Sequence, residues 1–202
     1  SKIVKVDTKI KKKFIDIFHN EYFLSASNIE NLSFVIELAK KFNVKKSNLI
    51  EAVKKFKGLN YRQQIIFKNK KISIINDSKS TSYSSSIEML KRKNNIYWLM
   101  GGIPKIGDKF NLSQNYCRNV QGYIFGVNQK KFSLDLKKKI KIKKFFNLSK
   151  ALNELFKDIK KDNSSNKTIL FSPAAASFDN FKNFEDRGKY FNKLIKKYIY
   201  AR

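Results

Sequence analysis

The side chains best suited to bind a charged substrate lie in one short polar segment, residues 76–81, with the sequence Asn-Asp-Ser-Lys-Ser-Thr. Asp77 offers a carboxylate, Lys79 an ammonium group and Thr81 a hydroxyl. The β-branched run 72–75 comes directly before them and predicts a buried strand. In an open α/β sheet, ligands bind beyond the carboxyl ends of the strands, which is where this segment would lie. The same residue types also favour helix caps and solvated turns, so on this segment alone both interpretations stay open.

Two later segments repeat the arrangement of a predicted strand followed by a loop that a ligand can approach. Residues 101–105, Gly-Gly-Ile-Pro-Lys, follow the strand predicted at 96–100, and Lys105 supplies a point charge for a carboxylate or a phosphate. This is not a P-loop, because no helix begins there with Gly-Lys-Ser or Gly-Lys-Thr. Residues 172–179, Ser-Pro-Ala-Ala-Ala-Ser-Phe-Asp, follow the strand predicted at 168–171. The three loops would share one edge of the sheet, which favours a binding site there.

The pattern of apolar residues alternates strands and helices from residue 65 to the end. This alternation predicts an α/β domain with a mostly parallel sheet and helices on both of its faces. Strands are predicted at 65–67, 72–75, 96–100, 122–127, 140–145 (an edge strand) and 168–171. Helices are predicted at 84–93, 112–118, 129–137, 148–159 and 185–198.

Earlier in the chain the same pattern predicts two helices and two weak strands. Ser27 or Asn28 would cap the first helix and Ser47 the second, and Gly58 would end the second. The helices are predicted at 28–42 and 47–56, and the strands at 3–6 and 14–18.

Asn28 and Asn31 lie three residues apart, on one face of the first predicted helix near its start. A primary amide offers one acceptor and two donors, which match the edge of an adenine ring. The alternative is that Asn28 only caps the helix and that Asn31 is a surface residue.

The composition is strongly basic, with 44 Lys and Arg against 16 Asp and Glu and a net charge of +28. Such a charge invites binding to nucleic acid, but the lysines are spread along the whole chain. The joint abundance of Lys, Asn, Ile, Phe and Tyr instead indicates the bias of an AT-rich genome. One Cys excludes a disulfide framework and a Cys-based zinc site, and favours a reducing, cytoplasmic setting. The apolar runs are too short to span a bilayer and no signal peptide is visible, so we expect no membrane partner.

Four motifs resemble, in this order, the carboxy-terminal part of the Mur ligase family. They are residues 58–62 (Gly-Leu-Asn-Tyr-Arg), 76–81, 101–105 and 172–188, of which the last begins Ser-Pro-Ala-Ala-Ala-Ser-Phe-Asp and ends Phe-Glu-Asp-Arg-Gly. Within the family they are most similar to the members that add D-glutamate to UDP-N-acetylmuramoyl-L-alanine. The resemblance covers the chain from about residue 27 to its end.

The resemblance implies a Rossmann-like C-terminal Mur ligase domain at 58–202, preceded at 1–57 by the helical tail of the family's central ATP-binding domain. It also implies a reaction in peptidoglycan precursor synthesis. ATP and Mg²⁺ phosphorylate the carboxylate of UDP-N-acetylmuramoyl-L-alanine, and the amine of D-glutamate attacks the acyl phosphate. The P-loop, the magnesium ligands and the modified lysine of the central domain are absent from this sequence. We therefore expect a fragment of a longer ligase, inactive by itself and without catalytic or metal-binding residues of its own.

Motif by motif, the resemblance also implies roles for individual residues. The positions at the nucleotide are Asn28 and Asn31 near adenine, Arg62 at the phosphates and Asp77 at the ribose. The positions around D-glutamate are Lys79, Thr81, Lys105, Ser177 and Phe184. Some residues depart from the family pattern. Ser27 and Tyr61 stand where His is common, so an imidazole contact to the nucleotide is lost. Ser82 replaces a frequent Asn, and Ala175 replaces a frequent Cys.

Two alternatives to this function stay open. One is a basic module that binds nucleic acid on a degenerate Mur ligase scaffold, although the joint presence of Asp77, Lys79, Lys105 and Ser177 is not needed by such a surface. The other is a related Mur or folylpolyglutamate-type ligase with a different amino acid in its pocket. The expected partners are ATP, D-glutamate and UDP-N-acetylmuramoyl-L-alanine, without specific nucleic acid, and the expected state is a monomer.

Overall fold

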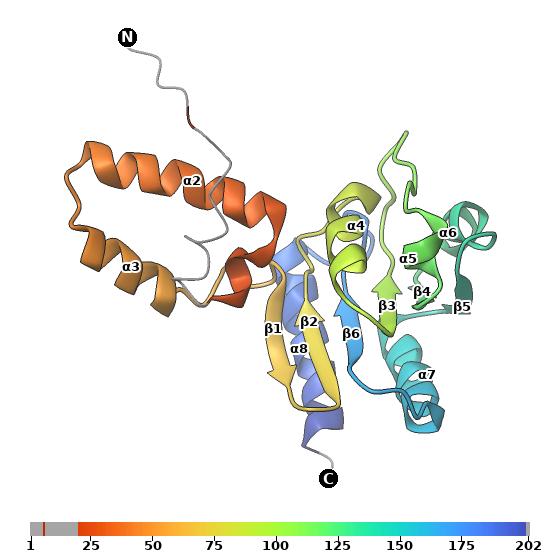
Figure 1. The fold of residues 1–202 in the computed structure, drawn as a ribbon. Coiled ribbons are helices and arrows are strands. Elements are labelled where there is room, and N and C mark those ends of the chain that lie inside the picture. The colour runs from red at the N-terminus through yellow and green to blue at the C-terminus, as the bar shows by residue number, and fades with distance from the viewer. Residues whose placement is uncertain (1–5, 7–19, 201–202) are drawn as a thin grey trace. The chain divides into compact units, whose positions relative to one another are not determined.

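The structure is a computed structural model that describes residue 6 and residues 20–200 (Figure 1). The chain divides into two compact units, Ser1–Gly58 and Leu59–Arg202. Apart from residue 6, the strands predicted at 3–6 and 14–18 lie outside the described residues.

The first unit is helical, and its helices bury a small apolar core around Leu32, Ile36 and Val53. The hydrophobic spacing predicted both α-helices to within two residues of their observed ends. The elements are the 3-10 helix η1 (Glu21–Leu24) and the α-helices α2 (Ala26–Lys41) and α3 (Lys46–Lys55).

The N-terminal cap of α2 differs from the prediction. Ser25 caps the helix: its backbone is extended, and its hydroxyl accepts a hydrogen bond from the Asn28 backbone N–H at 3.2 Å. Ser27 and Asn28 already lie inside the helix, where a side chain no longer takes the N-cap geometry.

The predicted caps of α3 are also wrong. Its N-cap residue is Lys45, without a side-chain cap, so Ser47 lies inside the first turn. The helix ends with Phe56 as its C-cap, and Gly58 follows two residues later with a φ of +79°. Apolar spacing locates a helix, but the backbone angles of single residues decide where its caps lie.

The second unit is built on a six-stranded sheet in the order β1-β2-β6-β3-β4-β5. β1 and β2 form an antiparallel hairpin, and every other neighbouring pair is parallel. The predicted mostly parallel sheet is confirmed, with the strand at 140–145 at its edge. The strands are β1 (Gln64–Lys68), β2 (Ile72–Asn76), β3 (Ile96–Met100), β4 (Val120–Phe125), β5 (Lys141–Phe145) and β6 (Lys167–Phe171).

Helices pack on both faces of this sheet, as predicted. Strand β3 shows why: Trp98 and Met100 contribute to one apolar cluster, while Tyr97 and Leu99 contribute to the other, because successive side chains of a strand point to opposite faces. The first cluster contains side chains of α4 (Tyr83–Arg92), α5 (Gln114–Cys117) and α6 (Gln129–Leu136). The second contains side chains of α7 (Leu148–Lys161) and α8 (Phe184–Ile199).

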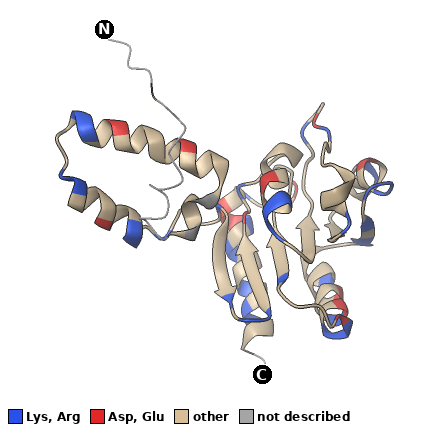
Figure 2. Cartoon of the chain, in the orientation of Figure 1, with Lys and Arg blue, Asp and Glu red and all other residues tan. Residues whose placement is uncertain are grey.

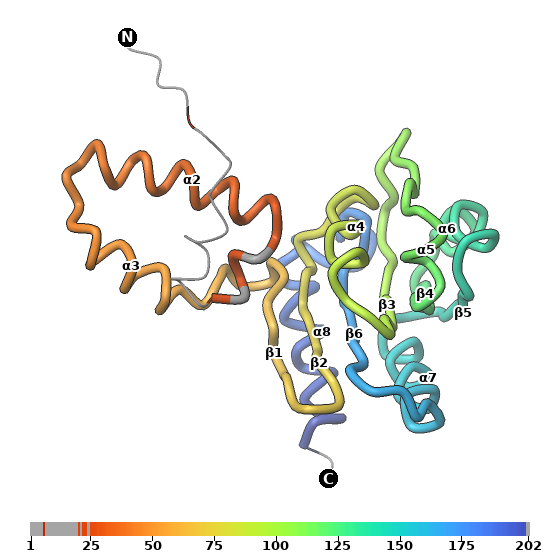
Figure 3. Tube along the Cα trace, viewed as in Figure 1, coloured from red at the N-terminus to blue at the C-terminus, as the bar shows by residue number. Residues whose placement is uncertain are grey.

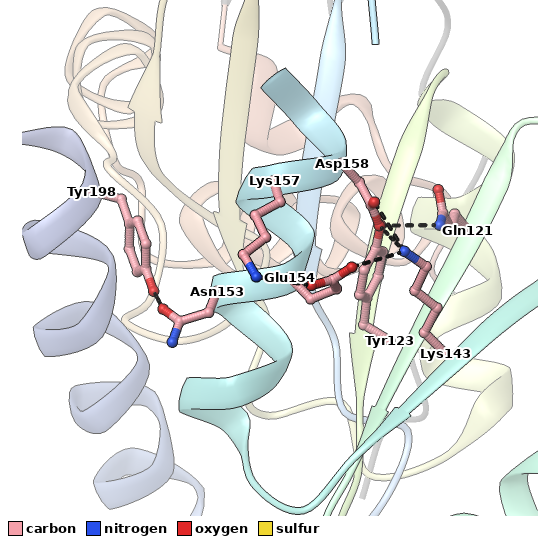
Figure 4. Close-up of polar contacts among 8 residues, drawn as sticks. All are labelled: Gln121, Tyr123, Lys143, Asn153, Glu154, Lys157, Asp158 and Tyr198. Atoms are coloured by element: carbon pink, nitrogen blue, oxygen red, sulfur yellow. Dashed lines mark hydrogen bonds and ion pairs between the residues drawn. The ribbon is translucent and has the colours of Figure 1, made fainter. Parts of the chain in front are cut away.

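A polar cluster attaches α7 to β4 and β5 (Figure 4). The Asp158 carboxylate of α7 accepts hydrogen bonds from the Tyr123 hydroxyl at 2.6 Å and from the Lys143 ammonium group at 2.8 Å. Lys143 also lies 3.2 Å from a carboxylate oxygen of Glu154, one turn earlier on α7. The cluster satisfies the hydroxyl of the buried Tyr123 ring, which would otherwise be costly to bury.

Lys and Arg residues are spread over the helices, strands and loops of both units rather than gathered on one element (Figure 2). Among the described residues, no helix combines the length and apolar character needed to cross a membrane.

Candidate functional site

The structure brings three of the four sequence motifs to one edge of the sheet as neighbouring loops, and hydrogen bonds from Lys79 to Tyr61 and from Gln63 to Asp77 hold the end of the fourth motif, residues 58–62, beside them. β2, β6 and β3 are neighbouring parallel strands, so the loops that follow their carboxyl ends lie side by side, with the loop after β6 in the middle. We call this region the carboxyl edge, formed by loops 77–82, 101–113 and 172–183. The loop after β3 extends well beyond the sheet in the trace of the chain (Figure 3).

Asp77 lies at the buried floor of the carboxyl edge, with only 5% of its surface exposed. Its carboxylate accepts hydrogen bonds from the Gln63 backbone N–H at 3.0 Å and from the Ser172 hydroxyl at 2.9 Å. Burial raises the pKa of Asp77 to about 7, while these two hydrogen bonds and the nearby Arg62 guanidinium act in the opposite direction. The carboxyl group therefore changes between its neutral and its charged form near neutral pH.

Hydrogen bonds made by the two neighbours of Arg62 hold its backbone close to this carboxylate. The Gln63 N–H donates to Asp77, and the Lys79 N–H donates to the Tyr61 carbonyl at 3.0 Å. Arg62 stands between these two bonded residues, and its side chain is exposed. The structure thus places an exposed guanidinium near a buried carboxylate, and the predicted contact of Arg62 with phosphate stays a prediction.

A chain of buried serine hydroxyls continues from Asp77 into α4. The Ser172 Oγ lies 2.8 Å from the Ser86 Oγ, which lies 2.7 Å from the Ser80 Oγ. A hydroxyl both donates and accepts, so each serine satisfies its neighbour. The chain joins the loops after β2 and β6 to the first turns of α4.

Lys79 and Phe184 contact each other directly. The Lys79 ammonium nitrogen lies 4.2 Å from the centroid of the Phe184 ring, a cation–π geometry. The Ser78 hydroxyl donates to the Phe184 carbonyl at 2.8 Å, which fixes the start of α8 against the loop after β2. Both side chains are half-buried, and Thr81 is exposed in the same loop.

Backbone hydrogen bonds join the loops that carry Lys105 and Ser177. Ile103 and Ala176 form an isolated antiparallel bridge, each N–H donating to the other's carbonyl at 2.9 Å. Gly102 permits this approach: its φ is +127°, and a Cβ there would stand 2.2 Å from the Ala176 carbonyl oxygen. Ser177 is buried next to the bridge, whereas Lys105 is exposed two residues beyond it.

The central side chain of the carboxyl edge, Arg187 of α8, was not among the predicted site residues. It is fully buried and donates to the Ser78 carbonyl at 2.7 Å, the Ser78 hydroxyl at 3.0 Å and the Ala175 carbonyl at 2.9 Å. Burial lowers its pKa to about 10, while the Asp179 and Asp77 carboxylates act to raise it. A sequence signal existed: Arg187 lies four residues before Phe191, in the apolar stripe of the last predicted helix.

The two asparagines belong to the first unit. The Asn28 side-chain amide donates to the Tyr22 carbonyl at 2.7 Å and is buried, whereas Asn31 is exposed on the same helix. The structure therefore gives Asn28 a structural hydrogen bond, and the predicted contact of both residues with adenine stays a prediction. Within the part of the chain that the structure describes, no group of three or more His, Cys, Asp or Glu residues is arranged to hold a metal ion.

Comparison with known proteins identifies relatives of this chain, although no family model matches it. The UDP-N-acetylmuramoylalanine–D-glutamate ligase of Rickettsia felis is 34% identical over 179 residues, which are 89% of this chain and 40% of that protein. The ligase of the same name from Wolbachia sp. subsp. Brugia malayi is 33% identical over 171 residues, or 85% of this chain and 34% of that protein. The chain thus spans well under half the length of these relatives.

Solved structures share its fold at low sequence identity. UDP-N-acetylmuramate–alanine ligase from Thermotoga maritima superposes with a TM-score of 0.60 at 19% identity, over 88% of this chain and 39% of that one. The ligase MurF from Acinetobacter baumannii superposes with a TM-score of 0.62 at 15% identity, over 85% of this chain and 38% of that one.

Proposed function

From its relationship to the Mur ligases, whose C-terminal domain has the fold seen here, we propose that this chain supplies the amino-acid-binding domain of an ATP-dependent ligase. The substrates would be D-glutamate and UDP-N-acetylmuramoyl-L-alanine, and the product a peptidoglycan precursor for the cell wall. The relatives are longer than this chain. We assign the groups that activate ATP to the part of such an enzyme that the chain does not span.

The observation that supports this proposal is the convergence of Lys79, Lys105 and Ser177 at the carboxyl edge. D-Glutamate has two carboxylates and one amine. Two ammonium groups and the hydroxyls of neighbouring loops offer the donors that the carboxylates need. The half-buried Phe184 ring, already in contact with Lys79, would cover the amino acid on one side.

The nucleotide would lie beside Asp77 and Arg62. The Arg62 guanidinium suits phosphate oxygens, and the Asp77 carboxylate accepts from ribose hydroxyls when it is ionised. When bound, ATP with Mg²⁺ supplies the phosphoryl group that activates the carboxylate of the acceptor, and the described residues of this chain offer no acidic cluster for the metal.

The role of this chain in the reaction would be to orient D-glutamate. Lys105, Thr81 and Ser177 would hold the D-glutamate carboxylates so that its amine faces the activated acyl group. Fixing the nucleophile in this way converts a bimolecular encounter into a step within one complex. The amine must lose a proton during the attack, and no residue of this chain is assigned to remove it.

Calorimetric titration of the chain with D-glutamate, L-glutamate and L-lysine tests the proposal. We expect binding of D-glutamate, weaker binding of its mirror image and no binding of L-lysine. Lys105→Ala should weaken the binding of D-glutamate about tenfold or more, because it removes a charged hydrogen bond worth ~1.5–3 kcal/mol. Lys55→Ala is the matched control, since it removes the same charge from an exposed position on α3. Binding of L-lysine alone would favour a different ligase of this family.

A further inference from the structure

We propose that Asp108 is a positioning residue that fastens the Lys105 loop to the start of α4. The inference takes its ligand, D-glutamate, from the proposed function. Asp108 itself lies outside the motifs on which that function rests.

The first observation is a short hydrogen bond between the loop after β3 and the first residue of α4. The Asp108 carboxylate accepts from the Tyr83 backbone N–H at 2.5 Å. Tyr83 is the first residue of α4, so its N–H has no partner within the helix. The Ser82 cap serves the Ser85 N–H instead, which leaves the Tyr83 N–H for Asp108. A carboxylate is also favoured there by the helix dipole.

The second observation is that the loop is anchored on both sides of an exposed tip. On one side, Ile103 pairs with Ala176. On the other side, the buried Phe110 ring stacks on Trp98 with its centroid 5.7 Å away. Between them, Ile106 is 98% exposed. The Asp108 N–H donates to the Lys105 carbonyl at 3.3 Å, which closes the turn that carries Lys105.

These contacts link two of the three loops around the proposed amino-acid site. Thr81 comes directly before the N-cap Ser82 of α4, and Asp108 bonds the first residue of the same helix. Asp108 thus sets the backbone of Lys105 relative to Thr81. A loop already ordered in this way loses less conformational entropy when a ligand binds.

The test compares the parent chain with Asp108→Ala and Asp108→Asn by ¹⁵N relaxation. In Asp108→Ala we expect lower heteronuclear NOE values at residues 104–107 and an upfield shift of the Tyr83 amide proton. Asp108→Asn should keep part of the order, because its amide oxygen still accepts from Tyr83. Glu51→Ala should leave the loop unchanged. Equal loop order in Asp108→Ala and the parent would overturn the proposal.

Titration with D-glutamate then measures the effect on binding. We expect Asp108→Ala to bind D-glutamate roughly 2- to 12-fold more weakly than the parent, because it must order one long side chain on binding. The affinity of Asp108→Asn should lie between those of the parent and Asp108→Ala. Equal affinity of all three proteins would refute a positioning role. If the parent itself fails to bind D-glutamate, the proposed function fails with the substrate role of Asp108, while the relaxation data still decide whether Asp108 orders the loop.

Discussion

Replacing Asp77 by Asn should remove a pH-dependent loss of stability from the second unit. The carboxyl group is buried, and its pKa rises from 3.8 to about 7 in the folded protein. A group whose folded pKa exceeds its unfolded pKa binds more protons in the native state between the two values. Its stabilising contribution is fully present below about pH 4 and disappears as the pH rises to about 7.

The size of the effect follows from the difference of about three pKa units. At 1.36 kcal/mol per unit the full loss is about 4 kcal/mol, of which about 3 kcal/mol falls between pH 5 and pH 8. An Asn side chain has nearly the same shape and stays neutral. Its oxygen still accepts from the Gln63 N–H, and its amide donates to the Ser172 hydroxyl, which reverses the direction of the serine chain.

Urea unfolding at a series of pH values measures this difference. Trp98 is the sole tryptophan and is buried in the second unit, so its fluorescence reports on that unit alone. We expect the free energy of unfolding of Asp77→Asn to exceed that of the parent by a margin that grows from pH 5 to pH 8. Glu51→Gln, an exposed carboxylate in the other unit, is the control. A margin that stays constant over this range would contradict a raised pKa of Asp77 in the folded protein.

Other substitutions test the packing of the site and of the sheet, each measured as a urea midpoint by the same fluorescence. Gly102→Ala should destabilise by about 3 kcal/mol, because the new Cβ would meet the Ala176 carbonyl oxygen, whereas Gly107→Ala, at a φ of +76° in open space, should cost only about 1 kcal/mol. Equal costs at the two glycines would contradict this account of the bridge. Arg187→Met should lower the free energy of unfolding by about 3–5 kcal/mol. Arg187→Lys should restore little of this loss, because a single ammonium group cannot reach the same acceptors as the planar guanidinium. Full stability of the Lys variant would show that the guanidinium geometry is not needed. Asp158→Ala should cost about 1–3 kcal/mol by leaving a buried tyrosine hydroxyl without its acceptor, and a neutral result would show that water replaces the carboxylate.

The sequence predicted the sheet and the convergence of its loops because these features repeat along the chain. Strand β3 is apolar at every position, as a strand covered on both faces must be, and a polar or glycine-rich loop follows each of β2, β3 and β6. Parallel connection then brings those loops to one edge without any knowledge of side-chain contacts.

What the sequence left out depends on contacts between distant residues. The burial of Arg187 requires carbonyl groups from two loops that meet only in the folded sheet. The raised pKa of Asp77 likewise depends on how deeply the folded chain buries its carboxyl group. Ser25 replaced the predicted cap of α2 because one extended residue, rather than the hydrophobic period, decides where a helix begins.

Chemical-shift mapping of D-glutamate on the ¹⁵N-labelled chain tests whether the carboxyl edge is its binding site. We expect saturable shifts at Lys79, Lys105 and Ser177 and in the loops around them, with much smaller shifts for L-glutamate and none for L-lysine. Shifts confined to other surfaces, or equal shifts with all three amino acids, would contradict the assignment of the carboxyl edge as a D-glutamate site.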